Sequence, residues 1–253
     1  MSTLKKNKDR FWVVDISNSF TKFALSNSDR LFKIHRYPTP RINSHWIQKK
    51  FRSTHFPVVL SSVVPQKTTL FKMNLQSPLH LLNGKTAQGI QIDYPKPNQI
   101  GADRIANAIA AFQIYGGPAV VIDFGTAVTF DVISKKGFYS GGIIAPGLNV
   151  MTHYLHEKTA LLPLIKITKP KAIIGKSTRE AMLSGAVYGY QGLVKEILLR
   201  LKNELKESPK VIATGGQASI VTEGLSQVHQ RDPDLTLQGL RLFYQFKKNN
   251  FPF

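Results

Sequence analysis

Hydrophobic and polar residues follow one short pattern that occurs twice in this chain. Phe11–Leu25 (FWVVDISNSFTKFAL) and Ala119–Ile133 (AVVIDFGTAVTFDVI) each contain an apolar run, an aspartate, a turn of small residues and a further run with strand character. Such runs around small polar residues predict a hairpin. Asp15 and Asp123 take equivalent places in the two copies. We therefore expect two related halves, each with a carboxylate at a hairpin turn.

The rest of the pattern mixes strands and helices. Val58–Val63 is a continuous apolar run typical of a buried strand, whereas Gly101–Gln113 repeats apolar residues at helical spacing. Thr178–Leu205 predicts one long helix or two, and Leu235–Phe246 predicts a closing amphipathic helix. This mixture favours an α/β fold with mixed sheets flanked by helices.

A break in the chain separates the two expected halves. Tyr115–Pro118 combines two glycines with a proline, which interrupts regular structure. The length of 253 residues allows one large domain or two of ordinary size. We therefore predict a first half over residues 1–117 and a second half over residues 118–253.

The composition excludes several kinds of protein. The chain has no cysteine, which excludes disulfides, zinc-thiolate sites and cysteine nucleophiles. No apolar stretch approaches the roughly 20 residues of a membrane helix. FWVV at residues 11–14 is too short for the core of a signal peptide. We expect a cytoplasmic protein with no membrane partner.

The chain is strongly basic, with 34 Lys and Arg against 15 Asp and Glu and a formal net charge of +19. Such a charge attracts anions and can bind nucleic acid weakly. The alternative is a solvated, lysine-rich surface that helps to draw in anionic substrates. We favour this second interpretation over a nucleic-acid partner, because the basic residues are scattered and no basic helix alternates with aromatic residues.

The first turn carries groups that suit a phosphate chain. Hydroxyls, backbone N–H groups and one lysine can meet phosphate oxygens, and Asp15 can orient a bound Mg²⁺. The candidate residues are Asp15, Ile16, Ser17, Asn18, Ser19, Phe20, Thr21 and Lys22. The alternative is an ordinary polar turn in which Asp and Asn cap their own backbone.

The second turn, Asp123–Thr126, has sharper features. Gly125 permits close approach of a ligand to the backbone, Thr126 adds a hydroxyl, and Asp123 offers a hard oxygen suited to a cation. A plain hairpin turn is the alternative. The repetition of the aspartate favours a function, and the late segment Ala213–Gly216 has space for a purine and ribose against its backbone.

A third candidate stands at the start of the predicted helix over residues 101–113. Gly101-Ala102-Asp103-Arg104 places free N–H groups where an anion can bind. Arg104 can fork onto a carboxylate or phosphate, and Asp103 can accept a proton from a hydroxyl. The alternative is that Asp103 only stabilises the first turn of the helix.

These motifs, in this order, resemble the type III pantothenate kinases. The corresponding segments are Asp15–Ser19, Gly101–Arg104 (GADR), Asp123–Asp131 (DFGTAVTFD), Gly142–Gly147 and Ala213–Gly216. Further similarity lies in Ser61–Pro65, Gly175–Gly185 and Asp234–Leu242. The resemblance covers nearly the whole chain, and GADR together with DFGTAVTFD is a specific signal.

The resemblance implies an actin-like ATPase fold, as in acetate and sugar kinases, with two similar ribonuclease H-like halves around an ATP cleft. The implied reaction is phosphorylation of pantothenate by ATP to 4′-phosphopantothenate, the first step towards coenzyme A. It also implies a homodimer, Mg²⁺ with ATP, and a monovalent cation, K⁺ or NH₄⁺.

By position in the family motifs, Asp103 resembles the general base. Asp123 resembles the ligand of the monovalent cation, and Thr126 and residues 15–22 resemble ATP contacts. The pantothenate contacts implied are Tyr94, Gly101, Ala102, Asp103, Arg104 and Thr178. Capping of a helix is the alternative role for Thr178. Asp131 is either structural or holds a metal-bound water.

One residue departs from the family pattern. Ser17 stands where the family has a glycine in the first phosphate loop. A positive φ there would strain a serine by about 1–3 kcal/mol, whereas a negative φ would leave only crowding by the Cβ. The departure bears on ATP affinity and on activity.

Two other functions fit parts of the sequence. A non-catalytic regulatory or nucleic-acid-binding relative on the same scaffold would account for the basic charge and for Ser17. A kinase for another small hydroxy acid would keep the fold and change the acceptor. The matched Tyr94, GADR and Thr178 argue against this last alternative.

Overall fold

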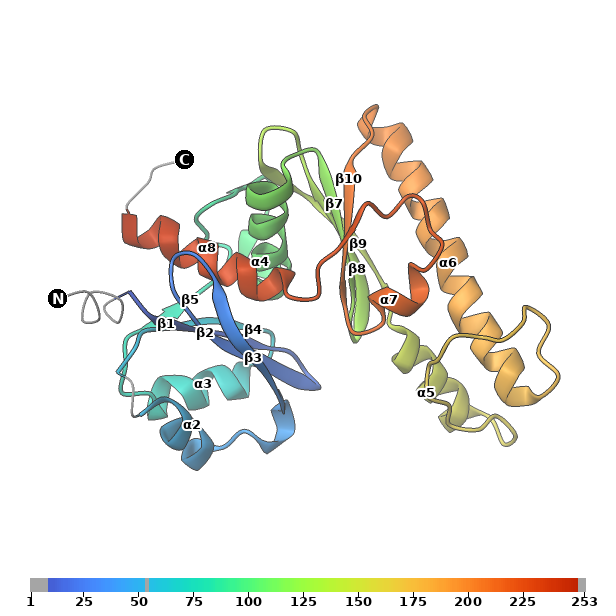
Figure 1. Ribbon diagram of the computed structural model, residues 1–253, viewed down its shortest axis with the longest axis horizontal. Helices are drawn as coiled ribbons and strands as arrows, with labels where there is room; N and C mark the ends of the chain where they lie inside the picture. Colours follow the sequence, from blue (N-terminus) through green and yellow to red (C-terminus); the bar gives the residue numbers. More distant parts are fainter. Residues whose placement is uncertain (1–8, 53–54, 250–253) are drawn as a thin grey trace. The chain divides into compact units, whose positions relative to one another are not determined.

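The computed structural model describes residues 9–52 and 55–249, and the chain divides into two compact units (Figure 1). Unit 1 comprises residues 1–115, 137–140 and 234–253, and unit 2 comprises residues 116–136 and 141–233. Each unit is built on a sheet flanked by helices, so the α/β class expected from the sequence is confirmed.

Unit 1 contains a five-stranded sheet in the order β3-β2-β1-β4-β5. Its strands are β1 (Phe11–Ile16), β2 (Phe20–Ser26), β3 (Leu31–Pro38), β4 (Val58–Ser62) and β5 (Leu79–Leu81). β1 is antiparallel to β2 and parallel to β4. The core side chains Trp12, Val14 and Ile16 alternate with Asp15, which therefore points to the other face of the sheet.

Helices cover both faces of this sheet. On one side lie α2 (Ser44–Phe51) and α3 (Pro65–Asn74), whose Phe51 and Phe71 pack into the core with Trp12 and Val14. On the other side lie α4 (Ala102–Ala110) and α8 (Leu235–Asn249) (Figure 1). The remaining regular segments of the unit are β6 (Gln91–Ile92), the short 3-10 helices η1 (Thr39–Arg41) and η2 (Pro97–Gln99), and the π-helix η3 (Ala111–Tyr115), which continues α4.

The placement of α8 differs from the predicted halves, which put the closing helix in the second half. In the structure α8 belongs to unit 1. Gly239 lies so close to the backbone of Ala106 in α4 that there is no room for a Cβ. The buried side chains of α8, Leu237, Leu240 and Phe243 among them, are thus covered within unit 1.

Unit 2 repeats the arrangement of the first hairpin. The strand order is β11-β10-β7-β8-β9-β6. β6 pairs with Phe138 and Tyr139 at the start of β9, and these two residues belong to unit 1 like β6 itself. Its strands are β7 (Ala119–Phe124), β8 (Ala127–Ile133), β9 (Phe138–Pro146), β10 (Lys210–Gly215) and β11 (Gln230–Arg231). β7 is antiparallel to β8 and parallel to β10, just as β1 is to β2 and β4. The predicted repeat of hairpins is therefore confirmed.

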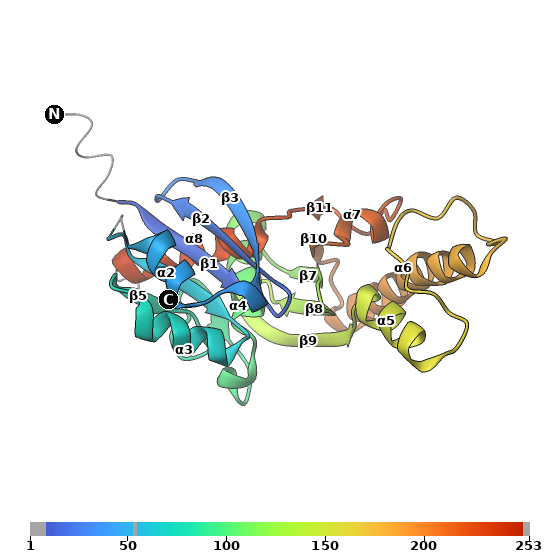
Figure 2. The same ribbon diagram turned by 90° about the horizontal axis from the view of Figure 1, so that it is seen from below.

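The helices of unit 2 are α5 (Leu148–Lys158), α6 (Thr178–Leu205) and the short α7 (Ala218–Val221). α6 is one continuous helix, and it packs against α5 (Figure 2). The core lies between these helices and the strand residues Val120, Ile122, Val128 and Phe130. In the described part of the chain, no helix is both long and apolar enough to cross a membrane.

Candidate active site

Asp103 stands in the first turn of α4, two residues after the N-cap residue Gly101. Its Oδ1 accepts a hydrogen bond of 2.8 Å from the backbone N–H of Arg104. A Cβ at Gly101 would stand 2.5 Å from the same oxygen, so a larger residue there would displace the carboxyl from its place over the helix start. Burial raises the pKa of Asp103, and the N–H and charge of Arg104 oppose this shift without cancelling it.

The aromatic side chain of Tyr139 contacts both Tyr94 and Arg104, the residue that follows Asp103. The buried ring of Tyr139 lies 6.3 Å from the ring of Tyr94 in an edge-to-face arrangement. The guanidinium of Arg104 stands 5.9 Å from the centre of the same Tyr139 ring. Tyr94 remains exposed at the surface. The predicted acceptor residues of unit 1, Tyr94 and the GADR tetrapeptide, are therefore brought together around Tyr139.

The first phosphate turn, defined as residues 15–22 between β1 and β2, has an exposed tip and a buried base. Asn18, Ser19 and Phe20 are exposed, whereas Asp15, Ile16 and Thr21 are buried. The hydroxyls of Thr21 and Thr39 lie 2.9 Å apart, and Thr39 donates a bond of 2.7 Å to the carbonyl of Ser17. Because Thr39 gives its proton to Ser17, Thr21 must be the donor of the pair. The buried hydroxyls of Thr21 and Thr39 thus hold the backbone of the turn at Ser17, while its tip remains exposed to solvent.

Ser17 adopts no left-handed backbone conformation. Among the described residues, His55 and Lys206 are the non-glycine residues with positive φ. The strain that a positive φ would have imposed on Ser17 is therefore absent. Its hydroxyl lies 3.4 Å from Oδ2 of Asp15, and Lys22 is the cross-strand partner of Asp15 on β2.

The second phosphate turn, between β7 and β8, is enclosed by two glycines from distant motifs. The N–H of Gly147 donates a bond of 2.9 Å to the carbonyl of Thr126, and a Cβ there would stand 2.5 Å from the carbonyl oxygen of Gly125. Gly215, with φ of +93°, would place a Cβ 2.6 Å from Oδ1 of Asp123. Three motifs that are far apart in the sequence therefore converge on this turn.

The glycine after Gly215 faces open space. An ideal Cβ at Gly216 would meet nothing within 4 Å. Gly216 lines a cavity of about 690 Å³ together with Asn149 and His153 of α5, Arg179 of α6 and Gln217. This volume is in the usual range for small-molecule sites. This cavity lies beside the segment where the sequence predicts that a purine and ribose could rest against the backbone.

Thr178 is the first residue of α6 and is exposed, but it is not the cap of the helix. Ser177 is the N-cap, and its hydroxyl accepts a bond of 3.3 Å from the N–H of Glu180. The Glu180 carboxylate in turn accepts a bond of 2.8 Å from the N–H of Lys176. The capping role considered for Thr178 is therefore wrong, because Ser177 performs it.

Asp131 is fully buried on β8, where the hydroxyl of Thr129 donates a bond of 3.2 Å to its Oδ2. Its cross-strand partner is Val121. This position inside the sheet fits a structural role.

Comparison with known proteins identifies the family. A family model described as type III pantothenate kinase matches residues 11–200. A type III pantothenate kinase from Akkermansia muciniphila is 48% identical over 235 residues, which cover 92% of this chain and 97% of that protein. This chain belongs to the type III pantothenate kinase family. It is accordingly an ATP-dependent kinase.

Solved structures support the fold of this type III pantothenate kinase. A conserved protein assigned to the Baf family of transcriptional activators, from Campylobacter jejuni, aligns with a TM-score of 0.64 at 21% identity and covers 94% of this chain and all 100% of its own. The activator of 2-hydroxyisocaproyl-CoA dehydratase from Clostridium difficile aligns with a TM-score of 0.54 at 10% identity, over 95% and 97% of the two chains. Together with the two related sheets, these likenesses confirm the actin-like fold class.

The sequence did not reveal three residues that organise this kinase's candidate site. Tyr139 joins Tyr94 to Arg104, Thr39 anchors the first phosphate turn, and Gly147 packs on the second. Gly147 lay in a recognised motif, but its contact with Thr126 depends on how β9 leads into α5. Tyr139 and Thr39 gave no signal, because their roles arise from pairing between distant segments.

Proposed function

We propose that this type III pantothenate kinase transfers the γ-phosphoryl group of ATP to the hydroxyl of pantothenate. The products are ADP and 4′-phosphopantothenate, the first intermediate towards coenzyme A. The observation that carries the proposal is the carboxyl of Asp103, whose pKa is raised by burial at the start of α4 beside Arg104 and Tyr139. We also expect the reaction to take place in the cytoplasm.

Asp103 is proposed to accept the proton of the pantothenate hydroxyl as phosphoryl transfer proceeds. A raised pKa makes a carboxylate a stronger base, and a positioned base contributes about 10²–10⁴-fold to the rate. The exposed Tyr94 and the guanidinium of Arg104 are proposed to hold pantothenate. The carboxylate of pantothenate can accept two parallel hydrogen bonds from a guanidinium. Gly101 and Ala102 would line the same site. Thr178 is proposed as a pantothenate contact from its position in the family motif alone.

ATP is proposed to bind through the phosphate turns. In unit 1 the exposed tip Asn18–Phe20 offers polar groups to phosphate oxygens, while Asp15 and Lys22 stand at its base. In unit 2 the hydroxyl of Thr126 is exposed on the glycine-enclosed turn. We propose that the adenosine occupies the cavity beside Gly216, because that glycine leaves its backbone open to a flat ring.

Two cations belong to the proposal. Mg²⁺ accompanies ATP and offsets the charge of its phosphates. A monovalent cation, K⁺ or NH₄⁺, is assigned to Asp123, which is partly exposed and lies beside the carbonyl groups of a tight turn. Within the described residues, no three His, Cys, Asp or Glu side chains lie together in a group that could hold a metal ion. The donor set therefore fits a weakly held cation with backbone oxygen ligands rather than a transition metal.

A homodimer is also proposed. Large apolar side chains of unit 2 are unusually exposed around α5 and the following loop, with Leu161 at 87%, Ile174 at 70% and Ile173 at 65%. Ile144, Val150, Tyr154 and Leu164 add to this exposed apolar surface. A second copy would remove it from water. Sedimentation analysis of the purified chain would test this, and a monomer at micromolar concentration would refute it.

The catalytic proposal is tested by a coupled assay for ADP with purified protein, ATP, Mg²⁺ and K⁺, with and without pantothenate. We expect ADP formation that depends on pantothenate and loses most of its rate when Na⁺ replaces K⁺. Asp103→Asn should lower kcat by about 10²–10⁴-fold while ATP still binds. Asp29→Asn, the same change at an exposed turn, is the control. Failure of wild-type protein to form ADP above the pantothenate-free control would overturn the proposal.

A further inference from the structure

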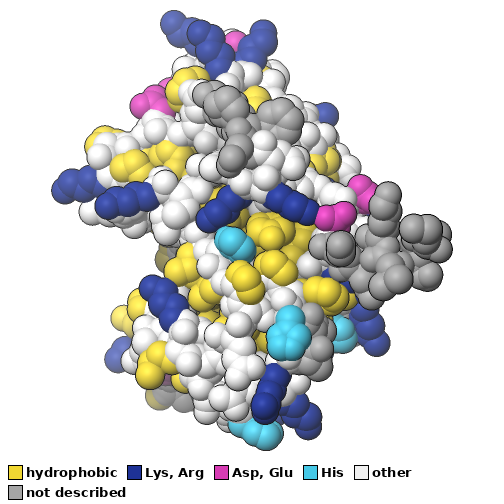
Figure 3. Space-filling view, turned by 90° about the vertical axis from the view of Figure 1, so that its left-hand side faces the viewer, with side chains coloured by type: hydrophobic (Ala, Val, Ile, Leu, Met, Phe, Trp, Pro, Cys, Tyr) yellow, Lys and Arg dark blue, Asp and Glu magenta, His cyan; other side chains and the backbone are white. Residues whose placement is uncertain are grey.

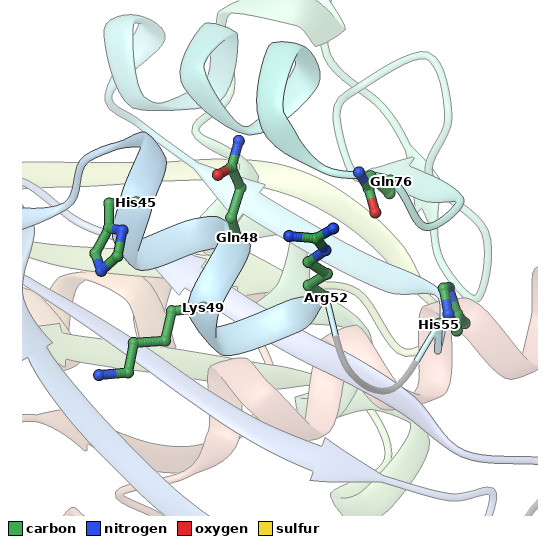
Figure 4. Close-up of a pocket in the computed structure, with 6 residues that line it drawn as sticks. All are labelled: His45, Gln48, Lys49, Arg52, His55 and Gln76. Carbon is green, nitrogen blue, oxygen red and sulfur yellow. The ribbon is translucent and has the colours of Figure 1, made fainter.

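A second cavity lies on unit 1, in a region that none of the proposed catalytic or substrate-binding residues occupies. It measures about 650 Å³ and is lined by His45, Gln48, Lys49, Arg52, His55 and Gln76 (Figure 4). Positions 45, 48, 49 and 52 follow the spacing of one helix face, so they form a single stripe along α2. The opposite stripe, Ile47 and Phe51, is buried in the core. The fold therefore fixes α2 with its basic stripe facing the cavity.

The charge of this cavity has one sign. No lining residue is acidic, and the whole segment over residues 30–92 contains ten Lys and Arg and no Asp or Glu. On the face of the molecule drawn in Figure 3, Lys and Arg side chains lie at several places, some of them next to one another. Lys49 and Arg52 repel each other with no nearby carboxylate on the segment to offset them. An anion in the cavity would relieve that repulsion.

The two cationic side chains that line the cavity differ from neighbouring lysines in their interactions with the rest of the described chain. Lys50, the neighbour of Lys49, lies 5.1 Å from the centre of the Phe23 ring, and Lys67 donates a bond of 2.7 Å to the carbonyl of Ile42. Within the described part of the chain, by contrast, the side chains of Lys49 and Arg52 form no hydrogen bond or ion pair. Figure 4 shows Gln48 and Arg52 on the side of α2 that faces α3 and Gln76.

We propose that this cavity binds a small anion that carries more than one phosphate group. The stripe from His45 to Arg52 spans roughly 10 Å at 1.5 Å per residue, which is more than a single phosphate can contact. Gln48 and Gln76 add amide donors for further phosphate oxygens. This site is independent of the proposed kinase function, because it shares no residue with it.

A nucleic-acid strand fits the cavity less well. Proteins that bind single strands place aromatic side chains beside the basic groove, so that bases can stack on them. No Phe, Tyr or Trp lines this cavity. The nearest aromatic residue on α2, Trp46, already stacks on Tyr37 with ring centres 4.8 Å apart. A compact anion held by exposed amide and basic groups is therefore favoured over an extended polymer.

The test is calorimetric titration of inorganic tripolyphosphate into the full chain without nucleotide, because an ATP analogue also carries several phosphate groups and would occupy the proposed site. We expect saturable binding whose affinity is about tenfold or more lower in Lys49→Gln/Arg52→Gln. The control is Lys33→Gln/Lys85→Gln, which removes the same charge from exposed positions of the same segment. It should bind like wild type. Gln76→Glu, which adds a carboxylate to the cavity, should also weaken binding.

Three results would overturn the proposal. The first is no saturable binding to the wild-type chain, and the second is an equal loss in both double variants, which would mean general attraction to a basic surface. The third is tighter binding of a single-stranded oligonucleotide that also depends on Lys49 and Arg52, which would assign the cavity to a polymer. Unchanged thermal unfolding of the variants shows that they fold.

Discussion

The hydroxyl of Thr236 donates a buried hydrogen bond of 2.8 Å to the side-chain oxygen of Asn107, although the two residues are 129 positions apart in the chain. Thr236 lies in the first turn of α8, and Asn107 lies on α4 one turn after Asp103. The bond and the close contact of Gly239 with Ala106 fix α4 against α8. The position of the proposed base therefore depends on the last helix of the chain.

Thr236→Val should lower the free energy of unfolding by about 1–3 kcal/mol, because valine keeps the shape of threonine but removes a buried hydrogen bond. Urea unfolding at pH 7.5 measures this change. Thr236→Ser keeps the donor and should lose less. Equal loss in the two variants would mean that packing of the threonine methyl contributes as much to stability as the hydrogen bond.

The rate of phosphoryl transfer should depend on the ionisation of Asp103. Burial raises the pKa of this carboxyl above its ordinary value of 3.8, while Arg104 opposes the shift. The base must be deprotonated, so kcat/KM should fall as the pH is lowered through this raised pKa, with the slope of a single proton. A pH profile at fixed ionic strength measures this. A flat profile down to pH 4 would remove Asp103 from the role of base.

The same raised pKa predicts an effect on stability. A carboxyl whose pKa is higher in the folded chain favours folding at low pH, and this advantage is lost as the pH rises through the folded pKa. Charged Asp103 therefore destabilises the fold at neutral pH. Asp103→Asn should unfold at a higher temperature than wild type at pH 7.5, with a gain that shrinks as the pH falls. A lower unfolding temperature at pH 7.5 would contradict the direction of the shift.

The sequence predicted the local features of this site better than their contacts. The hairpins that carry Asp15 and Asp123 were predictable, because period-two alternation is a local property of a strand. The start of α4 at GADR was predictable for the same reason. The role of Tyr139 was not, because it depends on the pairing of β9 with β6. The placement of α8 in unit 1 also could not be predicted, since an amphipathic pattern shows that a face is covered but not by which element.

Gly215→Ala should disrupt the second phosphate turn. Gly215 has a φ of +93°, and a Cβ there would stand 2.5 Å from the backbone nitrogen of Phe124. Strain and overpacking together should lower the free energy of unfolding by about 2–4 kcal/mol. The Michaelis constant for ATP should rise with it, because the turn that carries Asp123 and Thr126 must move.

The control for Gly215 is Gly189→Ala. Gly189 lies at an exposed position of α6, and a Cβ there would meet nothing within 4 Å. Alanine should stabilise this helix by about 0.5–1 kcal/mol and leave the Michaelis constant for ATP unchanged. Thermal unfolding and steady-state kinetics of both variants test the pair. Similar effects of the two substitutions would show that the enclosure of the turn has no special importance.

The resemblance to the family motif implies a glycine where this chain has Ser17, and the effect of the serine can be isolated by Ser17→Gly. Because Ser17 does not adopt a positive φ, glycine relieves no backbone strain and instead gains freedom in the unfolded chain. We expect a loss of about 0.4–1 kcal/mol in the free energy of unfolding. The Michaelis constant for ATP should change less than about threefold, since the hydroxyl of Ser17 is directed to Asp15. Ser17→Ala separates the hydroxyl from the Cβ. A much lower Michaelis constant for ATP in Ser17→Gly, but not in Ser17→Ala, would show that the Cβ itself crowds the phosphate chain.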